Sequence, residues 1–415
     1  MAKPLPRLRA NLDFMPSPVA DRPGLLIRDS LGYSDATLII PPLLVECLHF
    51  FDGEGTELDV RRTLVEATGD LRVGEAVHHL VGALSQAGFL EDEVYARLRD
   101  EKHKAFAESP VREASHAGAA YPGEAQELRA RLEQYVNHRA PAAALENLIG
   151  IAAPHLSFEG GHECYQAAYS LLRAEHAEHT FVILGTSHYG QSEKFGLTRK
   201  PYVTPLGRAA TDEALVDELN RKAPSAVVME DYCHAVEHSI EFQVIFLQHL
   251  CGPEIRILPV LCGPFGRSLS GDGAPEEDPG VRVFLSALGE IAAREQQRLF
   301  WVLGIDLAHI GPRYGDGFAV EAQRGLMAEV AERDQARLER VSAGDAGGFW
   351  EQVRGAGDDL RWCGASVLYT FLRCRPDARG AVLRYGQWNI DERSVVSFGA
   401  LAFLGQRYSG TAASQ

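Results

Sequence analysis

Residues 180–188 read TFVILGTSH, an unbroken apolar run that ends in a short polar turn. Similar runs are LIGIAAPH (148–155), IRILPVLCG (255–263), LFWVLGIDLAH (299–309), AVLRYGQWN (381–389) and VVSFGALAFLG (395–405). Helical patterns lie between them at 124–137, 161–174, 212–222, 238–250, 319–341 and 364–373. Apolar strands separated by helices are typical of a sheet that is covered on both faces. The sequence therefore predicts an α/β sandwich over residues 112–408, followed by a tail at 409–415.

The first part of the chain has a different texture. Residues 1–20 are proline-rich and lack periodicity, so we expect a flexible arm. Two strand-like runs and three helical patterns predict a small winged-helix-like domain over residues 21–95, followed by a linker helix at 96–111. A plain helical domain without a ligand is the alternative. His78 and His79 fit a helix surface or core better than a metal site.

Composition limits the possible functions. The chain has 415 residues, of which 46% are hydrophobic and 24% charged, a balance typical of soluble globular proteins. Its formal net charge of −16 argues against binding to nucleic acid or to an anionic membrane. No apolar run is long enough to span a membrane. The seven cysteines include no C-x-x-C pair, so we expect no disulfide framework and a cytoplasmic location.

Three of the apolar runs end in side chains that can carry chemistry. IAAPH ends at His155, ILGTSH ends at His188, and GIDLAH supplies Asp306 and His309. Open α/β sheets bind ligands at the carboxyl ends of their strands, so we expect these side chains to meet in one crevice. Imidazoles with a nearby carboxylate are typical of metal sites. The sequence therefore predicts a shared metal or catalytic site.

Two other segments add candidates. In EHSIEFQ, Glu237 and Glu241 share one helical face, and His238 either caps the helix or acts as a proton donor. In RWCG, Cys363 precedes a helix whose dipole would favour a thiolate, although the local sequence alone favours a buried inert cysteine. Cys262, at a strand end, is the next candidate thiol.

Taken together, these segments resemble a known family. REASHAGAAYPGEAQELRARLEQYV (112–136), IAAPH, ILGTSH, VTPLG, DYCHAVEHSIEFQ, ILPVLCG, GIDLAHIG and RWCG occur in the order found in the Memo family. Bacterial members of that family occur with a radical-SAM protein and an AMMECR-type protein, which the resemblance implies as partners. The N-terminal residues, about 20–95, resemble the peptide-chaperone domain of pyrroloquinoline-quinone biosynthesis and related leader-peptide recognition domains.

The Memo resemblance implies a fold like that of class III extradiol dioxygenases, which use non-haem Fe(II). By motif, His155, His188 and Cys363 become metal ligands. The catalytic positions are then His309 and His238 for proton handling, Asp306 as an orienting group, and Glu237. Iron is the first expectation for the metal and copper the second, whereas a zinc site would support hydrolysis.

Two departures from the family pattern bear on the substrate. Leu156, Ser157 and Phe158 replace an Ala-Gly-Tyr stretch, which removes a phenol, and Ala365 and Ser366 replace an Arg-His pair, which removes a charge. The leading hypothesis is an oxidoreductase that acts on an unidentified small molecule or peptide, delivered by strand addition to the N-terminal domain. The competing hypothesis is a non-catalytic adaptor that binds metal or peptide in the same crevice.

Overall fold

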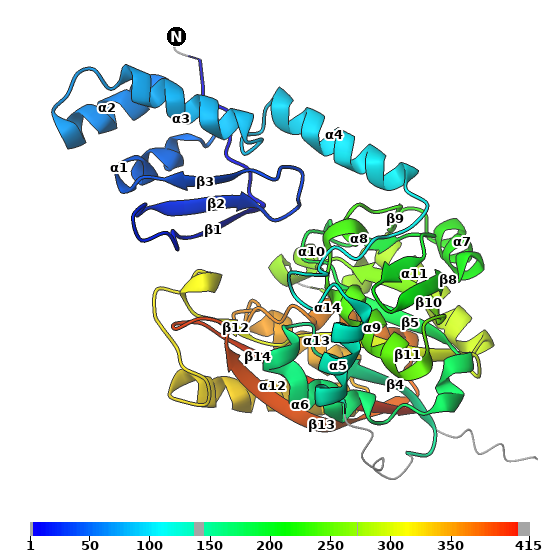
Figure 1. The fold of residues 1–415 in the computed structure, drawn as a ribbon. Coiled ribbons are helices and arrows are strands. Elements are labelled where there is room, and N and C mark those ends of the chain that lie inside the picture. Colours follow the sequence, from blue (N-terminus) through cyan, green and yellow to red (C-terminus); the bar gives the residue numbers. More distant parts are fainter. Residues whose placement is uncertain (1–2, 137–144, 272, 406–415) are drawn as a thin grey trace, which may run out of the picture. The chain divides into compact units, whose positions relative to one another are not determined.

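The structure, a computed structural model, describes residues 3–136, 145–271 and 273–405. The chain forms two compact units, Met1–Ser109 and Pro110–Gln415, which are blue to cyan and cyan to red in Figure 1. Within the described ranges, no helix is both long and apolar enough to cross a membrane. The predicted tail at 409–415 lies outside these ranges.

The N-terminal unit is a small sheet with helices. Strands β1 (Leu12–Pro16), β2 (Leu25–Asp29) and β3 (Thr37–Ile40) pair antiparallel in that order. The helices are α1 (Pro42–Val45), the 3₁₀ turn η1 (Glu46–Phe50), α2 (Glu57–Thr68), α3 (Gly74–Gln86) and α4 (Glu93–Glu108). Thr56 caps α2 in a reciprocal capping box with Asp59, and Gly69 ends it in the left-handed conformation. The winged-helix assignment stays a prediction.

Strand β1 lies where the sequence predicted a flexible arm, so the structure differs from that expectation over Leu12–Pro16. The preceding segment is also anchored, because the buried Arg9 guanidinium donates to both carboxylate oxygens of Asp29 at 2.9 Å and to the Gly88 carbonyl. These partners are distant in the sequence, which explains why local composition did not reveal them.

The C-terminal unit is built on one large mixed sheet with strand order β12-β14-β4-β11-β5-β10-β6-β9. Its centre is parallel: β4 (Leu148–Ala153), β11 (Leu299–Gly304), β5 (Thr180–Thr186) and β10 (Arg256–Cys262) run the same way. Strand β14 (Val395–Gly405) pairs antiparallel with β4 and with β13 (Ala378–Asn389). The shorter strands are β6 (Phe195–Leu197), β7 (Tyr202–Thr204), β8 (Gly207–Thr211), β9 (Val227–Met229) and β12 (His309–Ile310).

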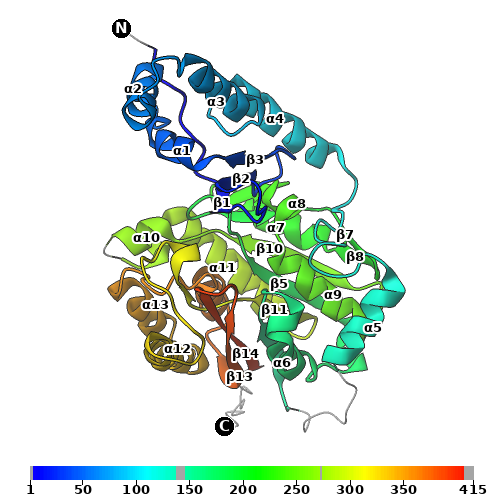
Figure 2. The same cartoon turned by 60° about the vertical axis from the view of Figure 1, so that its left-hand side comes forward.

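Helices cover both faces of this sheet (Figure 2). One face carries α5 (Ala125–Tyr135), α6 (Phe158–Tyr169) and α9 (Ser239–Cys251). The other carries α7 (Glu213–Lys222), α11 (Pro279–Arg294), α12 (Leu326–Ser342), α13 (Ala346–Gly355) and α14 (Ala365–Cys374). The remaining helical pieces are η2 (Ala174–Glu178), α8 (Cys233–Val236), α10 (Gly266–Ser270), η3 (Pro275–Glu277) and η4 (Pro312–Tyr314).

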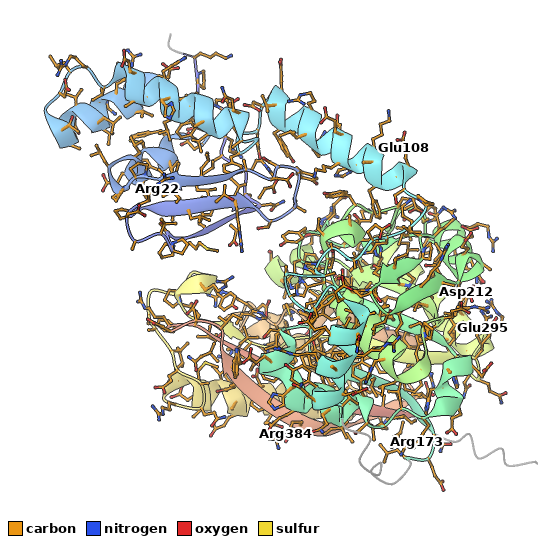
Figure 3. The ribbon with its side chains drawn as sticks, in the orientation of Figure 1. Arg22, Glu108, Arg173, Asp212, Glu295 and Arg384 are labelled. Atoms are coloured by element: carbon orange, nitrogen blue, oxygen red, sulfur yellow. The ribbon has the colours of Figure 1, made fainter. Side chains whose placement is uncertain are left out.

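Alternation along β5 shows how the two cores arise. Phe181 and Ile183 pack into the core under α5, α6 and α9, whereas Val182 and Leu184 pack into the core on the opposite face. At the surface, Arg384 of β13 pairs with Glu163 of α6, which ties a strand to the helix that covers it (Figure 3). The predicted α/β fold with a mixed sheet is confirmed, whereas its extradiol-dioxygenase type stays a prediction.

Candidate metal centre

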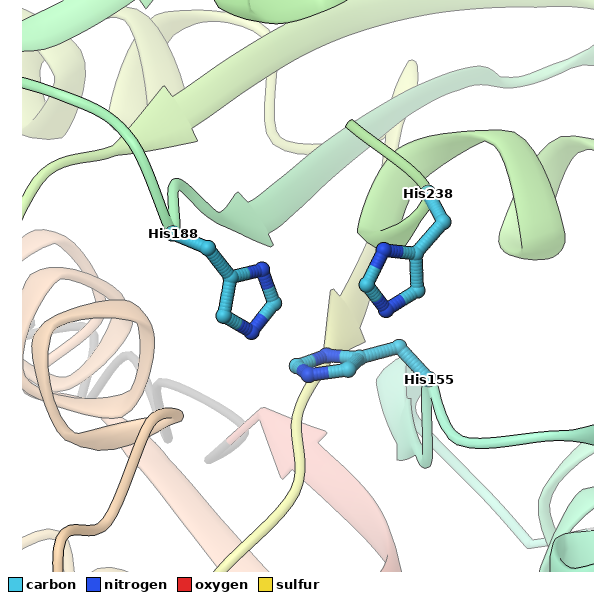
Figure 4. Close-up of side chains that lie close together, drawn as sticks. All are labelled: His155, His188 and His238. Atoms are coloured by element: carbon cyan, nitrogen blue, oxygen red, sulfur yellow. The ribbon is translucent and has the colours of Figure 1, made fainter. Parts of the chain in front are cut away.

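Three histidines meet at the carboxyl end of the parallel strands. His155 follows β4, His188 follows β5, and His238 is the N-cap of α9. Because β4, β11 and β5 are adjacent and parallel, the turns that follow them lie at the same edge of the sheet. One ring nitrogen from each histidine lies within 4.8 Å of the others, and the rings converge in Figure 4.

The three rings differ in surroundings. His155 is buried, and burial holds its pKa well below the ordinary value for histidine. Its ring lies edge-on to those of His188 and His238, with centroids 5.1 and 5.3 Å away. The rings of His188 and His238 stack at 5.1 Å and are partly exposed. The cluster therefore has one buried wall and one side open to solvent.

The Glu237 carboxylate, which is 1% exposed, orients two of these rings. It accepts from the backbone N–H of His188 and of His238, both at 2.9 Å, and lies 3.0 Å from His188 Nδ1 and 3.2 Å from His238 Nδ1. Burial would raise the pKa of Glu237, but the neighbouring His188 outweighs this effect and holds it well below the usual range. A carboxylate on Nδ1 fixes the ring and leaves Nε2 to coordinate.

Cys363, in the turn before α14, completes the group. Its Sγ lies 3.3 Å from His155 Nε2 and 3.5 Å from the Asp306 carbonyl oxygen. Burial raises the pKa of this thiol, and His188 opposes that rise. The structure thus places Cys363 beside His155, whereas the donors that lie within 4.8 Å of one another are those of His155, His188 and His238. The ligand set His155, His188 and Cys363 stays a prediction.

Asp306 lies against His155. One carboxylate oxygen accepts from the His155 backbone N–H at 3.1 Å, and the other is 3.6 Å from His155 Nε2. Burial raises the pKa of Asp306 to about 7. His309 is set further back, where Nδ1 faces the Leu307 carbonyl at 2.9 Å and burial lowers the ring's pKa to about 4.

Tyr314, which sequence reasoning missed, packs edge-on to His309 with ring centroids 4.9 Å apart. Burial raises the pKa of its phenol, Arg313 opposes that rise, and Asp306 and Cys363 add to it. At the position of the lost family tyrosine, Phe158 stacks on Tyr121 in the hydrophobic core instead. The sequence carried no signal for Tyr314, because a tyrosine that follows a strand-end histidine has no fixed spacing from it.

Glu241, a carboxylate candidate from the sequence, lies outside the centre. It is fully buried, pairs with the buried Arg112 guanidinium, and accepts from the Tyr121 hydroxyl and from the backbone N–H of Ser115 at 3.2 Å. Arg112 outweighs the effect of burial and lowers the pKa of Glu241. This carboxylate therefore holds the segment before α5 against α9.

Cys262 is also outside the histidine cluster. It is completely buried, and burial raises the pKa of its thiol to about 12, so it is a poor candidate for a reactive thiolate. Cys363 remains the thiol that contacts the candidate ligands.

The donor set fits a transition metal. Imidazoles whose ring nitrogens lie within 4.8 Å of one another, together with a nearby cysteine sulfur, are ligands that iron, copper and zinc all accept. The carboxylate on His188 Nδ1 is the outer contact that such a ligand usually has. His155, His188 and Cys363 could hold the ion, with His238 as a further donor.

Comparisons with known proteins find relatives along most of this chain. A family model described as Memo-like protein matches residues 112–402. A MEMO1 family protein of Thermus thermophilus is 30% identical over 334 residues, 80% of this chain and 94% of the relative. A MEMO1 family protein of Aquifex aeolicus is 28% identical over 291 residues, 70% of this chain and 73% of the relative. One of Methanopyrus kandleri is 26% identical over 303 residues, covering 69% and 96%.

Proposed function

The chain belongs to the Memo-like protein family, and on that premise we propose that it is a metal-dependent, dioxygenase-like oxidoreductase. The observation that carries the proposal is the meeting of His155, His188 and Cys363 beside a buried carboxylate that orients one of the imidazoles. Fe(II) is the first choice of metal, and copper or zinc are the alternatives, because the thiolate makes the set softer than two histidines and a carboxylate. When bound, the ion would supply Lewis-acid and redox chemistry toward a substrate and O₂.

The protein's own groups have separable tasks in this proposal. Glu237 keeps Nδ1 of His188 occupied, so that Nε2 is the coordinating atom. Asp306 fixes the backbone at His155 and can hold a proton near neutral pH. His238, which shares the Glu237 carboxylate, is placed either to exchange protons with a bound molecule or to act as a further ligand.

Metal analysis of single variants tests the ligand set. We expect the full-length protein, loaded anaerobically with Fe(II), to hold about one ion per chain, and His155→Ala, His188→Ala and Cys363→Ser each to lose it. His162→Ala is the matched control, because this histidine is exposed on α6, where its Nδ1 faces the Glu159 carbonyl and its ring lies 6.0 Å from that of Tyr135. Unchanged metal content in the His188 variant would refute the proposal. Comparing His238→Gln with Cys363→Ser identifies the third ligand.

A non-catalytic adaptor is the second candidate. It is supported by the separate N-terminal unit, whose strands β1 and β3 each pair only with β2 among the described residues and so present sheet edges that could take up a peptide strand. Radical-SAM and AMMECR-type proteins are the proposed partners. Oxygen consumption by the iron-loaded protein, supplied with reductant and candidate substrates, favours the enzyme, whereas saturable peptide binding without turnover favours the adaptor.

A further inference from the structure

A cavity of about 270 Å³ opens beside His188 and Cys363. Its walls are largely apolar: Phe265, Leu269, Trp350, Trp362 and Ala365 line it. Trp350 and Trp362 are almost completely buried, so their positions are fixed by packing. The volume lies just below the range of about 300–1,000 Å³ that is usual for small-molecule pockets, so the cavity accepts a ring-sized group and not a folded peptide.

The indole N–H donors in the wall are already used. Trp362 Nε1 donates to Asp334 at 2.7 Å, and Trp350 Nε1 donates to the Gly273 carbonyl at 3.3 Å. Both indoles therefore direct their N–H groups into the protein. The small part of each ring that reaches the cavity, at 1% and 2% exposure, offers a ligand an aromatic contact, which attracts cations and apolar groups.

Two of the three hydroxyl groups in the wall follow the same rule, whereas the third, that of Ser187, is buried without a hydrogen-bond partner among the described residues. Thr186 donates its proton to the Cys363 carbonyl at 3.1 Å, and Ser366 donates to the Cys262 carbonyl at 3.4 Å. Their oxygens keep lone pairs but have no further proton to give. To a ligand, these two side chains are hydrogen-bond acceptors.

Besides the His188 imidazole, the charged side chains in the wall are Arg361, which is neutralised, and Asp358, which has no ion pair among the described residues. Arg361 makes a two-point ion pair with Asp316, at 2.7 and 3.2 Å, and also donates to the His309 carbonyl. Asp358 accepts the Trp362 backbone N–H at 3.1 Å, and this bond occupies one of its two carboxylate oxygens. Arg337, whose guanidinium lies 5.3 Å from the Trp362 ring centroid, and Arg361 attract this carboxylate without forming an ion pair with it among the described residues.

We propose that this cavity binds a small, mainly apolar molecule that carries a cationic or hydrogen-bond-donating group and no anionic group. The wall supplies aromatic surface, hydroxyl acceptors and the Asp358 carboxylate, which suit an ammonium, amine or hydroxyl on a hydrocarbon ring. The inference that such a molecule is the substrate rests on the proposed function, because the candidate ligands His188 and Cys363 line the cavity. The inference that the cavity prefers to bind such a molecule does not depend on the metal.

Three probes of equal size but different charge test the preference: benzylamine, benzyl alcohol and benzoate. Each is titrated into the full-length protein by ligand-observed NMR, first metal-loaded and then after chelation, so that an amine–metal bond cannot produce the result. We expect benzylamine to bind at least tenfold more tightly than benzoate in both states. Asp358→Asn should reduce the advantage of benzylamine over benzyl alcohol about fivefold. Asp359→Asn, the neighbouring carboxylate that is paired with Arg333, should leave it unchanged.

A second pair of variants locates the binding. Leu269→Phe fills the cavity and should weaken benzylamine at least fivefold, whereas Leu326→Phe, at an exposed position on α12, should not. Benzoate binding as tightly as benzylamine, no saturable binding of any probe, or insensitivity to both Asp358→Asn and Leu269→Phe would overturn the inference. Metal content is measured on the same samples, so a chain that binds benzylamine but holds no metal would refute the proposed function and leave the cavity assignment standing.

Discussion

Removing the Asp334 carboxylate should both lower the free energy of unfolding of the C-terminal unit and weaken metal binding at the candidate centre. Asp334, on α12, is fully buried and accepts three hydrogen bonds: from Trp362 Nε1 at 2.7 Å, the Tyr385 hydroxyl at 2.8 Å and the Ser397 hydroxyl at 2.6 Å. Ser397 in turn accepts the backbone N–H of Ala308 at 2.8 Å. One carboxylate thus connects the Cys363 turn with the loop that carries Asp306 and His309.

The size of the effect follows from the donors left behind. Asp334→Ala strands one indole N–H and two hydroxyls, and each buried unpaired donor costs about 1–3 kcal/mol. The hydroxyls can rotate toward other acceptors but the indole cannot, so we expect a loss of about 3–5 kcal/mol. Asp334→Asn keeps an oxygen that accepts from Trp362, and it removes a carboxylate whose charge is disfavoured by burial, which is why burial raises its pKa. This variant should therefore lose only about 1–2 kcal/mol of the free energy of unfolding.

Urea denaturation followed by tryptophan fluorescence measures this loss selectively. All four tryptophans lie in the C-terminal unit, so the signal reports that unit alone. The Ala variant should also bind metal more weakly, with the Asn variant recovering most of the affinity. A cost below about 1 kcal/mol for Asp334→Ala, or equal costs for the two variants, would refute the argument.

Three further predictions concern other parts of the chain. Arg9→Met leaves the buried Asp29 carboxylate without its cation and should cost the N-terminal unit about 3–5 kcal/mol, seen as faster amide exchange in β1 and β2; unchanged exchange would mean that the segment is not anchored. Gly364→Ala places a methyl 2.7 Å from Ile305 Cβ and 2.8 Å from the Asp306 carbonyl oxygen, so it should lower metal affinity, whereas Gly317→Ala, with open space around it, should not. Burial raises the pKa of Asp358 to about 6 in the folded protein. Between about pH 4 and pH 6 this carboxyl is therefore protonated in the folded state but ionised in the unfolded chain, so it lowers the free energy of unfolding as the pH rises through that window. The free energy of unfolding of Asp358→Asn, relative to that of the parent, should therefore be higher at pH 7 than at pH 4.5. The same difference between variant and parent at both pH values would contradict the argument.

The strand-end histidines could be found from the sequence because two local rules sufficed. An apolar run marks a central strand, and parallel strands bring the residues that follow them to one edge, so His155 and His188 had to be neighbours if β4 and β5 were close. Local rules also placed Glu237 beside His238. They could not show that Glu237 serves His188, which is 49 residues away.

Other features depended on signals that were weaker or absent. The Gly- and Pro-rich polar composition of residues 266–282 favours a surface loop, but this stretch contains α10 and the start of α11. Asp278 caps α11 and Pro279 occupies its first turn, which is a helix-start signal that the sequence does carry. The cavity wall joins Phe265 to Trp350 and Trp362, which no periodicity connects. Such a surface is created by tertiary packing and has no counterpart in a local pattern.

The loops that carry the candidate ligands are tied to one another by hydrogen bonds that need no metal. Asp306 accepts the His155 N–H, Thr186 donates to the Cys363 carbonyl, and the Gly364 N–H donates to the Asp306 carbonyl at 3.0 Å. Since these bonds fix the donor atoms before an ion arrives, metal binding should be a late addition to a folded unit and not the event that folds it, unlike in a zinc finger. Chelation should therefore leave the far-ultraviolet circular dichroism and the tryptophan emission unchanged. It should lower the free energy of unfolding only by the linkage amount, about 4 kcal/mol for an ion present at 1,000 times its Kd. Loss of the native spectrum on chelation would contradict this argument. It would show that burying the histidines and Cys363 without an ion is too costly, so that these side chains come together only around the metal.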